Sequence, residues 1–264
     1  MIGVYLSGTG NTRHCIEKLT DLLDESAQVV PLEDDKVAAL IARHDFIILA
    51  YPTQFSNAPI MVRDFIKQNP ALWRGKTVFC VVTMGLFSGD GAGCSARLLK
   101  RYGAHVVGGL HILMPDSVCD IKSLKRPIEK NREIVKAADR KIEETATEIK
   151  RGKYPKDGLN FCNHIAGFFG QRLWFFRKTH RYSKGPTIDS KCVGCGLCIR
   201  LCPMKNIVLS GGKAYANNQC TMCYRCISIC PQKAITLLGK EVIEQCRYER
   251  YASTQSAMEK ANQE

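Results

Sequence analysis

Eight of the 14 cysteines in the chain stand in two runs with the same spacing. Each run reads Cys-x2-Cys-x2-Cys-x3-Cys-Pro, first over residues 192–203 and again over 220–231. Thiolates at this spacing are typical of [4Fe–4S] ligation, in which the fourth cysteine of each run binds the cluster of the other run. We therefore expect two [4Fe–4S] clusters and a protein that moves electrons.

The exchange of the fourth cysteine divides the eight thiolates into two sets. We call the first set the cluster-one cysteines: Cys192, Cys195, Cys198 and Cys230. We call the second set the cluster-two cysteines: Cys220, Cys223, Cys226 and Cys202. Two zinc sites are an alternative, because zinc also takes four thiolates, but a proline after the fourth cysteine of both runs disfavours them. Disulfides are disfavoured as well.

The residues between the ligands differ between the two runs. Gly194 and Gly196 leave little side chain over cluster one, whereas Thr221, Met222 and Tyr224 cover cluster two more heavily. Hydrogen bonding and solvent exposure tune cluster potentials, so we expect the two potentials to differ. The alternative is that these residues only pack.

Residues 187–238 resemble a bacterial two-cluster ferredoxin module. A hairpin-like stretch follows each cysteine run, over 206–209 with a turn at Gly211 and Gly212, and over 234–238 with a turn at Gly239. The resemblance implies a small α+β domain, which we place at 187–246, followed by a polar tail at 247–264.

Length and composition favour a protein of two domains. The chain has 264 residues, of which 45% are hydrophobic, and this content excludes a disordered chain. Met1 leads directly into an apolar stretch that is typical of a buried strand, with no signal-peptide pattern. No apolar run approaches the roughly 20 residues of a membrane-spanning helix. We therefore expect a cytoplasmic protein.

Residues 1–150 alternate between short apolar stretches and stretches of helical spacing. The expected strands are 2–6, 28–32, 46–51, 78–83 and 106–113, and the expected helices are 12–25, 35–43, 59–69, 91–102 and 125–150. This alternation predicts an α/β fold with a doubly wound, parallel five-stranded sheet. Ligands of such sheets bind at the carboxyl ends of the strands.

The loop after the first predicted strand has the composition of a phosphate site. It carries two glycines and three hydroxyl side chains at the start of a helix, where free backbone amides favour an anion. We expect phosphate contacts from Ser7, Thr9, Gly10, Asn11 and Thr12. A capped, Ser/Thr-rich turn is the alternative. The loop resembles the flavodoxin signature, and the resemblance implies a flavodoxin-like domain at 1–152 that binds FMN.

Two further strand-end loops carry the ring contacts that this resemblance implies. They are Thr53, Gln54, Phe55 and Asn57 after the third strand, and Gly85, Phe87, Ser88, Gly89 and Asp90 after the fourth. Gln54 stands where relatives place an aromatic residue, so the ring stacking differs from theirs. Either phenylalanine is alternatively a loop side chain that closes the core. Asp90 is an acid near the flavin or, as we slightly favour, a helix cap.

The order of the domains is similar to that of flavodoxin–ferredoxin fusion proteins of anaerobic microbes. The resemblance implies an electron-transfer iron–sulfur flavoprotein that passes electrons between the clusters and FMN, and on to a partner redox protein. The alternative is a ferredoxin-dependent FMN reductase that acts on a small oxidised substrate. We predict no catalytic residue, and the flavodoxin-like domain is too short to include a separate nicotinamide-binding unit.

A connector at 153–186 matches neither family. It is rich in aromatic residues, and residues 151–184 hold eight Lys or Arg and one acid, out of a formal net charge of +13 for the chain. We expect its aromatic residues to pack between the domains. Alternatives are a peripheral anchor on an anionic membrane and a contact surface for an acidic redox partner. No nucleic-acid motif accompanies the charge. The six other cysteines are expected to be free thiols: Cys15, Cys80, Cys94, Cys119, Cys162 and Cys246.

Overall fold

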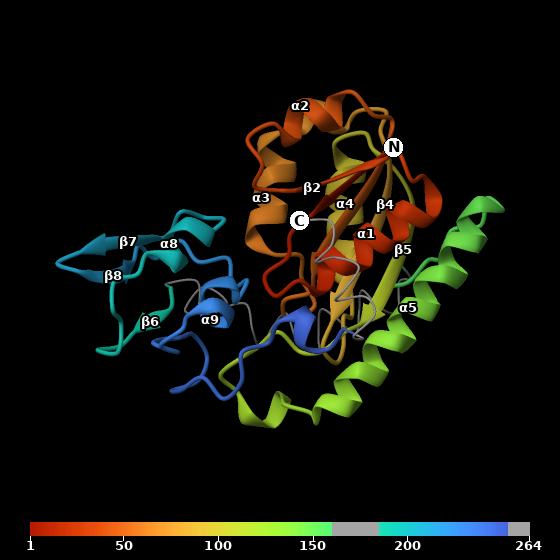
Figure 1. Cartoon of the computed structure of the whole chain (residues 1–264). Coiled ribbons are helices and arrows are strands. Elements are labelled where there is room, and N and C mark those ends of the chain that lie inside the picture. The colour runs from red at the N-terminus through yellow and green to blue at the C-terminus, as the bar shows by residue number, and fades with distance from the viewer. Residues whose placement is uncertain (160–184, 253–264) are drawn as a thin grey trace.

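The structure, a computed structural model, describes residues 1–159 and 185–252 (Figure 1). Its N-terminal unit is built on a parallel five-stranded sheet with the order β2-β1-β3-β4-β5. The strands are β1 (Ile2–Tyr5), β2 (Gln28–Pro31), β3 (Phe46–Pro52), β4 (Thr77–Met84) and β5 (His105–Leu113). This order is the flavodoxin-like doubly wound order, so the predicted fold and its five strands are confirmed.

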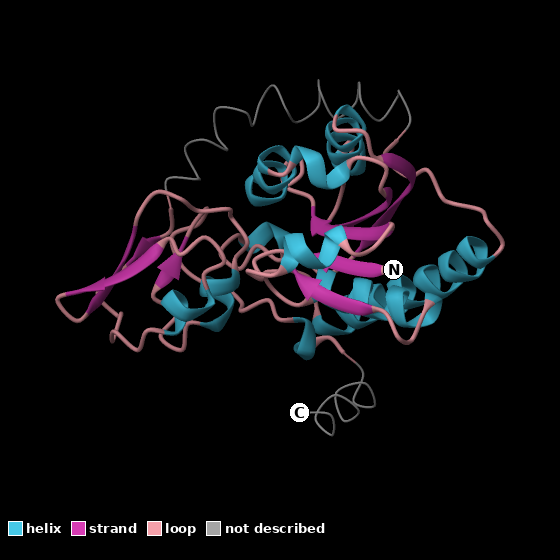
Figure 2. Ribbon diagram, turned by 90° about the horizontal axis from the view of Figure 1, so that it is seen from above, coloured by secondary structure: helices cyan, strands magenta, loops and turns pink. Residues whose placement is uncertain are grey.

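Five helices cover the two faces of this sheet (Figures 1 and 2). They are α1 (Asn11–Leu23), α2 (Val37–Ala42), α3 (Ile60–Gln68), α4 (Gly91–Arg101) and α5 (Ile128–Lys150), with short 3-10 turns η1 (Pro70–Trp73) and η2 (Lys122–Leu124). Helices α1 and α5 pack on one face, and α2, α3 and α4 pack on the other. Helices therefore cover both faces of the sheet, and the loops that follow the strands lie at its carboxyl edge.

The two apolar layers follow from the alternation of side chains along each strand. In β4, Val78, Cys80 and Val82 face the α2–α3–α4 layer, whereas Phe79 and Val81 face the α1–α5 layer. All five are completely buried. A strand with both faces covered is expected to be a continuous apolar run, which is how β4 stands in the sequence.

The C-terminal unit, residues 185–246, lies beside the carboxyl edge of the sheet (Figure 1). We call it the cluster unit. Its elements are β6 (Thr187–Ile188), α8 (Leu197–Leu201), β7 (Ile207–Ser210), β8 (Lys213–Ala216), α9 (Arg225–Ile229) and β9 (Ile235–Thr236). The β7–β8 hairpin turns at Gly211 and Gly212 as predicted. The second predicted hairpin is not formed, because β9 pairs with β6, although the chain bends at Gly239.

Asp120, in the loop after β5, anchors the cluster unit to the sheet. Its carboxylate accepts hydrogen bonds from the backbone amides of Leu237, Leu238 and Gly239 at 2.7, 2.9 and 3.0 Å, and from the hydroxyl of Tyr224 at 2.9 Å. A Cβ on Gly239 would lie 1.8 Å from the carbonyl oxygen of Asp120. Glycine at 239 therefore permits a close backbone approach rather than a hairpin turn.

Two described segments differ from expectation: the start of the predicted connector and the start of the predicted tail. Residues 155–157 pair with Gly109 of β5, and Tyr154 packs on the α1–α5 layer, so 153–159 belong to the N-terminal unit. At the other end, η4 (Tyr248–Arg250) and Tyr251 do not form a frayed tail. Tyr248 stacks on His14 with ring centroids 4.2 Å apart, and Tyr251 is buried. The aromatic residues 161–176, Cys162 and residues 253–264 lie outside the described residues.

Across 1–159 and 185–252, no helix is long and apolar enough to span a membrane.

Candidate cofactor sites

A cavity of about 260 Å³ opens at the carboxyl edge of the sheet, between the sheet and the cluster unit. Its walls come from the loops after β1, β3, β4 and β5 and from residues 222–224 of the cluster unit. Nine of the predicted flavin-binding residues line it: Ser7, Thr9, Asn11, Thr12, Thr53, Gln54, Phe55, Gly85 and Phe87. The topology thus brings together three loops that are distant in sequence.

The phosphate loop leads directly into α1. Gly10 takes a left-handed backbone (φ 92°) just before the helix, and the first turn of α1 carries no acidic residue. Thr9 and Thr12 are buried and hydrogen-bond to other hydroxyls, Thr9 to Ser117 in the loop after β5 and Thr12 to Thr83 near the end of β4, each at 2.8 Å. These contacts fix both hydroxyls at the positive end of the helix dipole, where an anion is favoured.

Three buried polar atoms of this cavity have no hydrogen-bond partner among the described residues. They are Ser7 Oγ, Asn11 Oδ1 and Thr53 Oγ1. Unpaired buried polar atoms cost free energy and call for a partner. The polar ligand best suited to a hydroxyl-rich helix start is a phosphate monoester, so the residues present fit FMN.

The loop after β3 forms a tight turn. Gln54 and Asn57 exchange backbone hydrogen bonds of 2.9 and 3.0 Å across Phe55 and Ser56, which both have a left-handed backbone. The side chain of Gln54 donates to the carbonyl oxygens of Thr221 and Met222. It therefore ties the loop to the cluster unit. Asn57 does not line the cavity and instead accepts from Cys94 Sγ at 3.2 Å.

The loop after β4 divides between the cavity and the interior. Gly85 and the half-exposed Phe87 line the cavity, whereas Ser88, Gly89 and Asp90 do not. Asp90 occupies the first position before α4, but its carboxylate makes no capping hydrogen bond. It is completely buried and forms a bidentate pair with Arg97, with contacts of 2.9 and 2.5 Å. The expected helix cap is therefore wrong, and Asp90 is an internal ion-pair partner.

The loop after β5 is a cavity wall that we did not predict. Asp116 lines the cavity, and burial raises the pKa of its carboxyl group, although the amide of Val118 and the cations Lys125 and Arg126 oppose that rise. The rule that ligands bind at carboxyl strand ends applies equally to this loop and was sufficient to find it. Met222, Cys223 and Tyr224 also line the cavity, and no sequence signal indicated this contact.

The eight motif cysteines fall into two groups around two further cavities. Cys192, Cys195, Cys198 and Cys230 line one of them. Cys202, Cys220, Cys223 and Cys226 line the other. Each group contains three cysteines of one run and the fourth of the other, as the exchange requires. The described residues include no group of His, Cys, Asp or Glu with the closer spacing that a single metal ion takes.

The cluster-two group touches the phosphate loop directly. A Cβ on Gly8 would lie 1.6 Å from the carbonyl oxygen of Cys223. Arg225, two residues further on, donates to the carbonyl oxygen of Ser7 at 2.7 Å and pairs with Glu33 at 2.5 Å. A cluster-two ligand therefore packs against the loop that would hold a flavin phosphate.

Family models match both halves of this arrangement. The model of the flavodoxin domain matches residues 2–92, and that of the 4Fe-4S dicluster domain matches residues 191–235. The chain carries a flavodoxin domain followed by a 4Fe-4S dicluster domain. The flavodoxin domain implies FMN, and the dicluster domain implies iron–sulfur clusters, so the protein is an electron-transfer iron–sulfur flavoprotein.

Solved structures that resemble the chain cover its flavodoxin domain. The flavodoxin of Megasphaera elsdenii is 21% identical, with a TM-score of 0.42, over 56% of this chain and 99% of that one. Flavodoxin 2 of Bacillus cereus is 21% identical, with a TM-score of 0.42, over 57% and 97%. A Fusobacterium nucleatum flavodoxin bound to flavin mononucleotide is 18% identical, with a TM-score of 0.40, over 58% and 98%. No curated protein matches the chain.

Proposed function

We propose that the protein is an electron carrier that passes low-potential electrons through two [4Fe–4S] clusters to FMN, and from there to a partner redox protein. When bound, the clusters exchange single electrons and FMN takes up one or two. The chain sets the order of the cofactors, shields the inner ones from water and offers the outer one to a partner.

The contact between Cys223 and the phosphate loop carries this proposal. Cys223 is a member of the cluster-two group and also lines the cavity of the flavodoxin domain, together with Met222 and Tyr224. Met222 and Tyr224 are 7% and 4% exposed. A cluster held there would have no solvent layer between itself and a flavin in the cavity, which supports direct electron transfer between them.

Cluster one would then be the outer cofactor. Cys195 is exposed, Val193 is 63% exposed, and nothing lies within 4 Å of a Cβ built on Gly196. We infer the order cluster one, cluster two, FMN. Electrons from a protein partner enter at cluster one, because it is the end of the chain of cofactors that a partner surface reaches.

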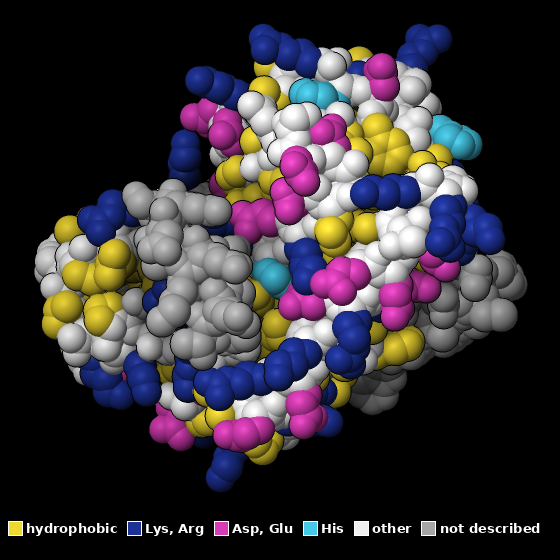
Figure 3. Space-filling model, turned by 45° about the vertical axis from the view of Figure 1, so that its right-hand side comes forward, with side chains coloured by type: hydrophobic (Ala, Val, Ile, Leu, Met, Phe, Trp, Pro, Cys, Tyr) yellow, Lys and Arg dark blue, Asp and Glu magenta, His cyan; other side chains and the backbone are white. Residues whose placement is uncertain are grey.

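The surface of the cluster unit favours an acidic partner. The cluster unit exposes apolar side chains, at the left in Figure 3, and six Lys or Arg side chains, against three acids in its sequence. The exposed cations are Lys191, Arg200, Lys205, Lys213, Lys233 and Lys240. Such a surface steers an acidic protein and makes the encounter rate depend on ionic strength.

The order of the cofactors is tested by comparing two reductants on one variant. We expect Cys195→Ala, loaded anaerobically with FMN and iron, to lose cluster one. Reduction of its flavin by a reduced acidic ferredoxin should slow by about tenfold or more, whereas reduction by dithionite should not, since a small reductant does not need the outer cluster. Stopped-flow absorption measures both rates. Equal slowing with both reductants would contradict the proposed order.

Asp116 supports the second candidate, a ferredoxin-dependent reductase of a small oxidised substrate. It is a carboxyl group in the cavity whose pKa is raised by burial, and a carboxyl group beside a substrate is a type of side chain that serves as a general acid. Turnover of small acceptors with a reduced ferredoxin as donor separates the candidates. Turnover that falls in Asp116→Asn, with unchanged reduction of the flavin, would favour the reductase over the carrier.

A further inference from the structure

Two cysteines outside the cluster motifs meet at the seam between the domains. Cys119 lies in the loop after β5, and Cys246 lies where the chain leaves the cluster unit. Both are buried, with 0% and 1% exposure. The backbone fixes them together, because the carbonyl oxygen of Cys119 accepts hydrogen bonds from the amides of Ile243 and Glu244 at 3.0 and 3.1 Å.

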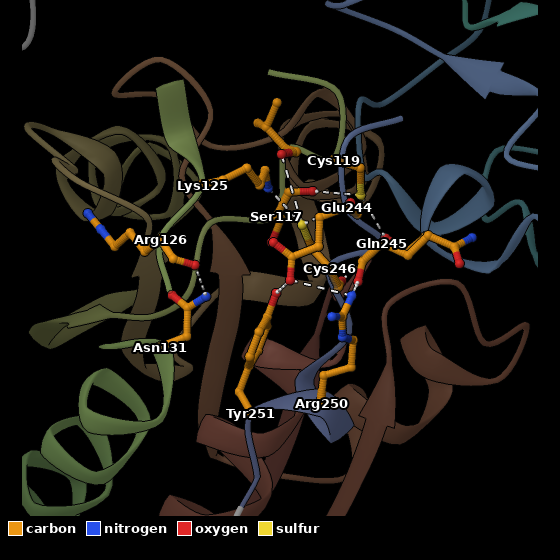
Figure 4. Close-up of polar contacts among 12 residues, drawn as sticks. Ser117, Cys119, Lys125, Arg126, Asn131, Glu244, Gln245, Cys246, Arg250 and Tyr251 are labelled. Atoms are coloured by element: carbon orange, nitrogen blue, oxygen red, sulfur yellow. Dashed lines mark hydrogen bonds and ion pairs between the residues drawn. The ribbon is translucent and has the colours of Figure 1, made fainter. Parts of the chain in front are cut away.

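The two thiols are direct neighbours. Cys246 Sγ lies 3.9 Å from the carbonyl oxygen of Val118, the residue next to Cys119, and each thiol shifts the pKa of the other. Cys119 Sγ also lies 3.2 Å from Ser228 Oγ of α9 and 3.4 Å from the carbonyl oxygen of Ser117 (Figure 4). The pair therefore joins a loop of the flavodoxin domain to the C-terminal segment and is packed against the dicluster domain.

A cation distinguishes the two sulfurs. Lys125 Nζ lies 2.8 Å from Cys246 Sγ. The hydrogen bond from Cys119, together with the ammonium group of Lys125, lowers the pKa of the Cys246 thiol to about 7, although burial and the charge of Glu244 oppose this. The carboxylate of Glu244 forms an ion pair with Arg250 and accepts a hydrogen bond from the hydroxyl of Tyr251. The ammonium group of Lys125 therefore favours the thiolate form at Cys246 rather than at Cys119.

The other buried thiols of the flavodoxin domain lack this arrangement. Cys15 and Cys80 are both completely buried, and burial raises the pKa of each, to about 12 for Cys80. Neither has a cation or a second thiol among the causes that shift its pKa. Thiolate character controls cysteine reactivity, so of these four buried cysteines, Cys119 and Cys246 are the two with the chemistry of a reactive dithiol.

We propose that Cys246 and Cys119 form a peroxide-reactive dithiol that closes to a disulfide across the domain seam. The Cys246 thiolate attacks one oxygen of hydrogen peroxide, the O–O bond breaks, and Cys246 becomes a sulfenic acid while hydroxide leaves. The sulfur of Cys119 then attacks the Cys246 sulfur, an S–S bond forms, the S–O bond breaks, and the Cys119 proton leaves with the oxygen as water. Together the Cys246 thiolate and the Cys119 thiol lose two electrons, and peroxide is reduced to one hydroxide and one water.

The disulfide would join two segments that meet beside the flavin cavity. Loop 114–120 forms one wall of the flavin cavity, and its Asp120 anchors residues 237–239 of the dicluster domain. A covalent link from Cys119 to Cys246 fastens the C-terminal segment onto that loop. The pair is buried, so the oxidant must be as small as peroxide or must enter during local opening of the seam.

The test uses the holoprotein, kept anaerobic and treated with one molar equivalent of hydrogen peroxide. Samples are denatured in an alkylating agent, digested without reductant and analysed by mass spectrometry, while absorption follows the clusters in the same samples. The expected result is a linked peptide pair containing Cys119 and Cys246 that accumulates before the clusters bleach. Clusters that bleach while both cysteines remain alkylatable would overturn the proposal.

Variants separate the roles of the three residues. In Cys119→Ser, a sulfenic acid should persist at Cys246 and be trapped by dimedone. Lys125→Met should slow formation of the link by about fivefold, since the gain in nucleophilicity of a thiolate of higher pKa partly offsets its smaller fraction. Lys125→Arg should restore the rate. An unchanged rate in Lys125→Met, or oxidation of Cys15 and Cys80 as fast as that of Cys246, would contradict the proposal. Circular dichroism checks that each variant is folded.

Discussion

The surroundings of the two cysteine groups of the dicluster domain differ in how much of the chain covers them. Around cluster one, the residues between the first three ligands of the run include Gly194, Gly196 and the 63% exposed Val193. Around cluster two, Thr221, Met222 and Tyr224 are 2%, 7% and 4% exposed, and Cys223 abuts the phosphate loop. Two runs of identical ligand spacing therefore serve different positions, one facing a partner and the other facing the flavin cavity.

The largest effect should come from removing one ligand of each group. Cys195→Ala is expected to lower the iron content by about half or more, since the groups share both runs, and to leave FMN bound. Cys223→Ala should lose iron and weaken FMN binding, because residues 222–224 line the flavin cavity. Iron and flavin per chain are the measurements. If Cys195→Ala keeps its full iron content, the proposed ligand sets are wrong.

The second prediction concerns the contact between Gly8 and the backbone of Cys223, which joins the phosphate loop to the cluster-two cysteines. Gly8→Ala would force the backbone of Cys223 away, and overpacking of this kind costs about 1–3 kcal/mol or more. FMN affinity should fall with it. Gly75→Ala is the matched control: nothing lies within 4 Å of its Cβ, so only the left-handed strain of about 1–2 kcal/mol remains. Thermal unfolding and FMN titration of both variants test this, and equal FMN affinities would count against the contact.

Asp116 should give a smaller, pH-dependent effect at the flavin cavity. Burial raises its pKa above the ordinary 3.8, so the native state binds this proton more tightly than the unfolded chain. The free energy of unfolding should therefore lose a contribution as the pH rises from about 3.8 through the raised pKa. FMN should also bind more weakly above that pKa, because the ionised carboxylate adds a negative charge to the cavity that would hold an anionic ligand. Asp116→Asn should flatten both pH profiles, and profiles identical to those of the parent chain would refute this role.

The smallest effect on stability should come from replacing an exposed apolar residue on the cluster unit or at the flavin cavity. Leu209 on the β7–β8 hairpin and Phe87 at the flavin loop are each 50% exposed. Replacing either with Ser should change the free energy of unfolding by less than about 0.5 kcal/mol, as at other surface sites. Only Leu209→Ser should slow electron uptake from an acidic protein donor. Equal slowing in Phe87→Ser would place the entry of electrons at the flavin end.

The sequence predicted the strands and the hairpin turn because these elements depend on residues that are close together in the chain. The five strands are buried apolar runs, and the turn at Gly211 and Gly212 joins a short hairpin, so periodicity and turn residues were sufficient. The side-chain contacts were not predicted. Asp90 was assigned to a cap, but Arg97, seven residues further along the chain in α4, pairs with its carboxylate. Gly239 was assigned to a turn, but Asp120, far back in the sequence, occupies the space beside it.

The seam between the domains lay beyond sequence reasoning for the same reason. Nothing around Met222 or Cys223 indicates that they face the phosphate loop, and nothing around Cys119 or Cys246 pairs two thiols 127 residues apart. Tyr248 was predicted to lie in a polar tail because its neighbours are charged, yet its ring stacks on His14. These contacts arise only when the cluster unit docks on the carboxyl edge of the sheet.

The most direct test of the central claim is a crystal structure of the anaerobically loaded holoprotein, with anomalous scattering recorded at the iron edge. We expect two iron peaks, the inner one bound by Cys202, Cys220, Cys223 and Cys226 and in contact with the wall of the cavity that holds FMN. An FMN bound elsewhere, or the cluster of Cys192, Cys195, Cys198 and Cys230 lying nearer to the flavin, would contradict the account.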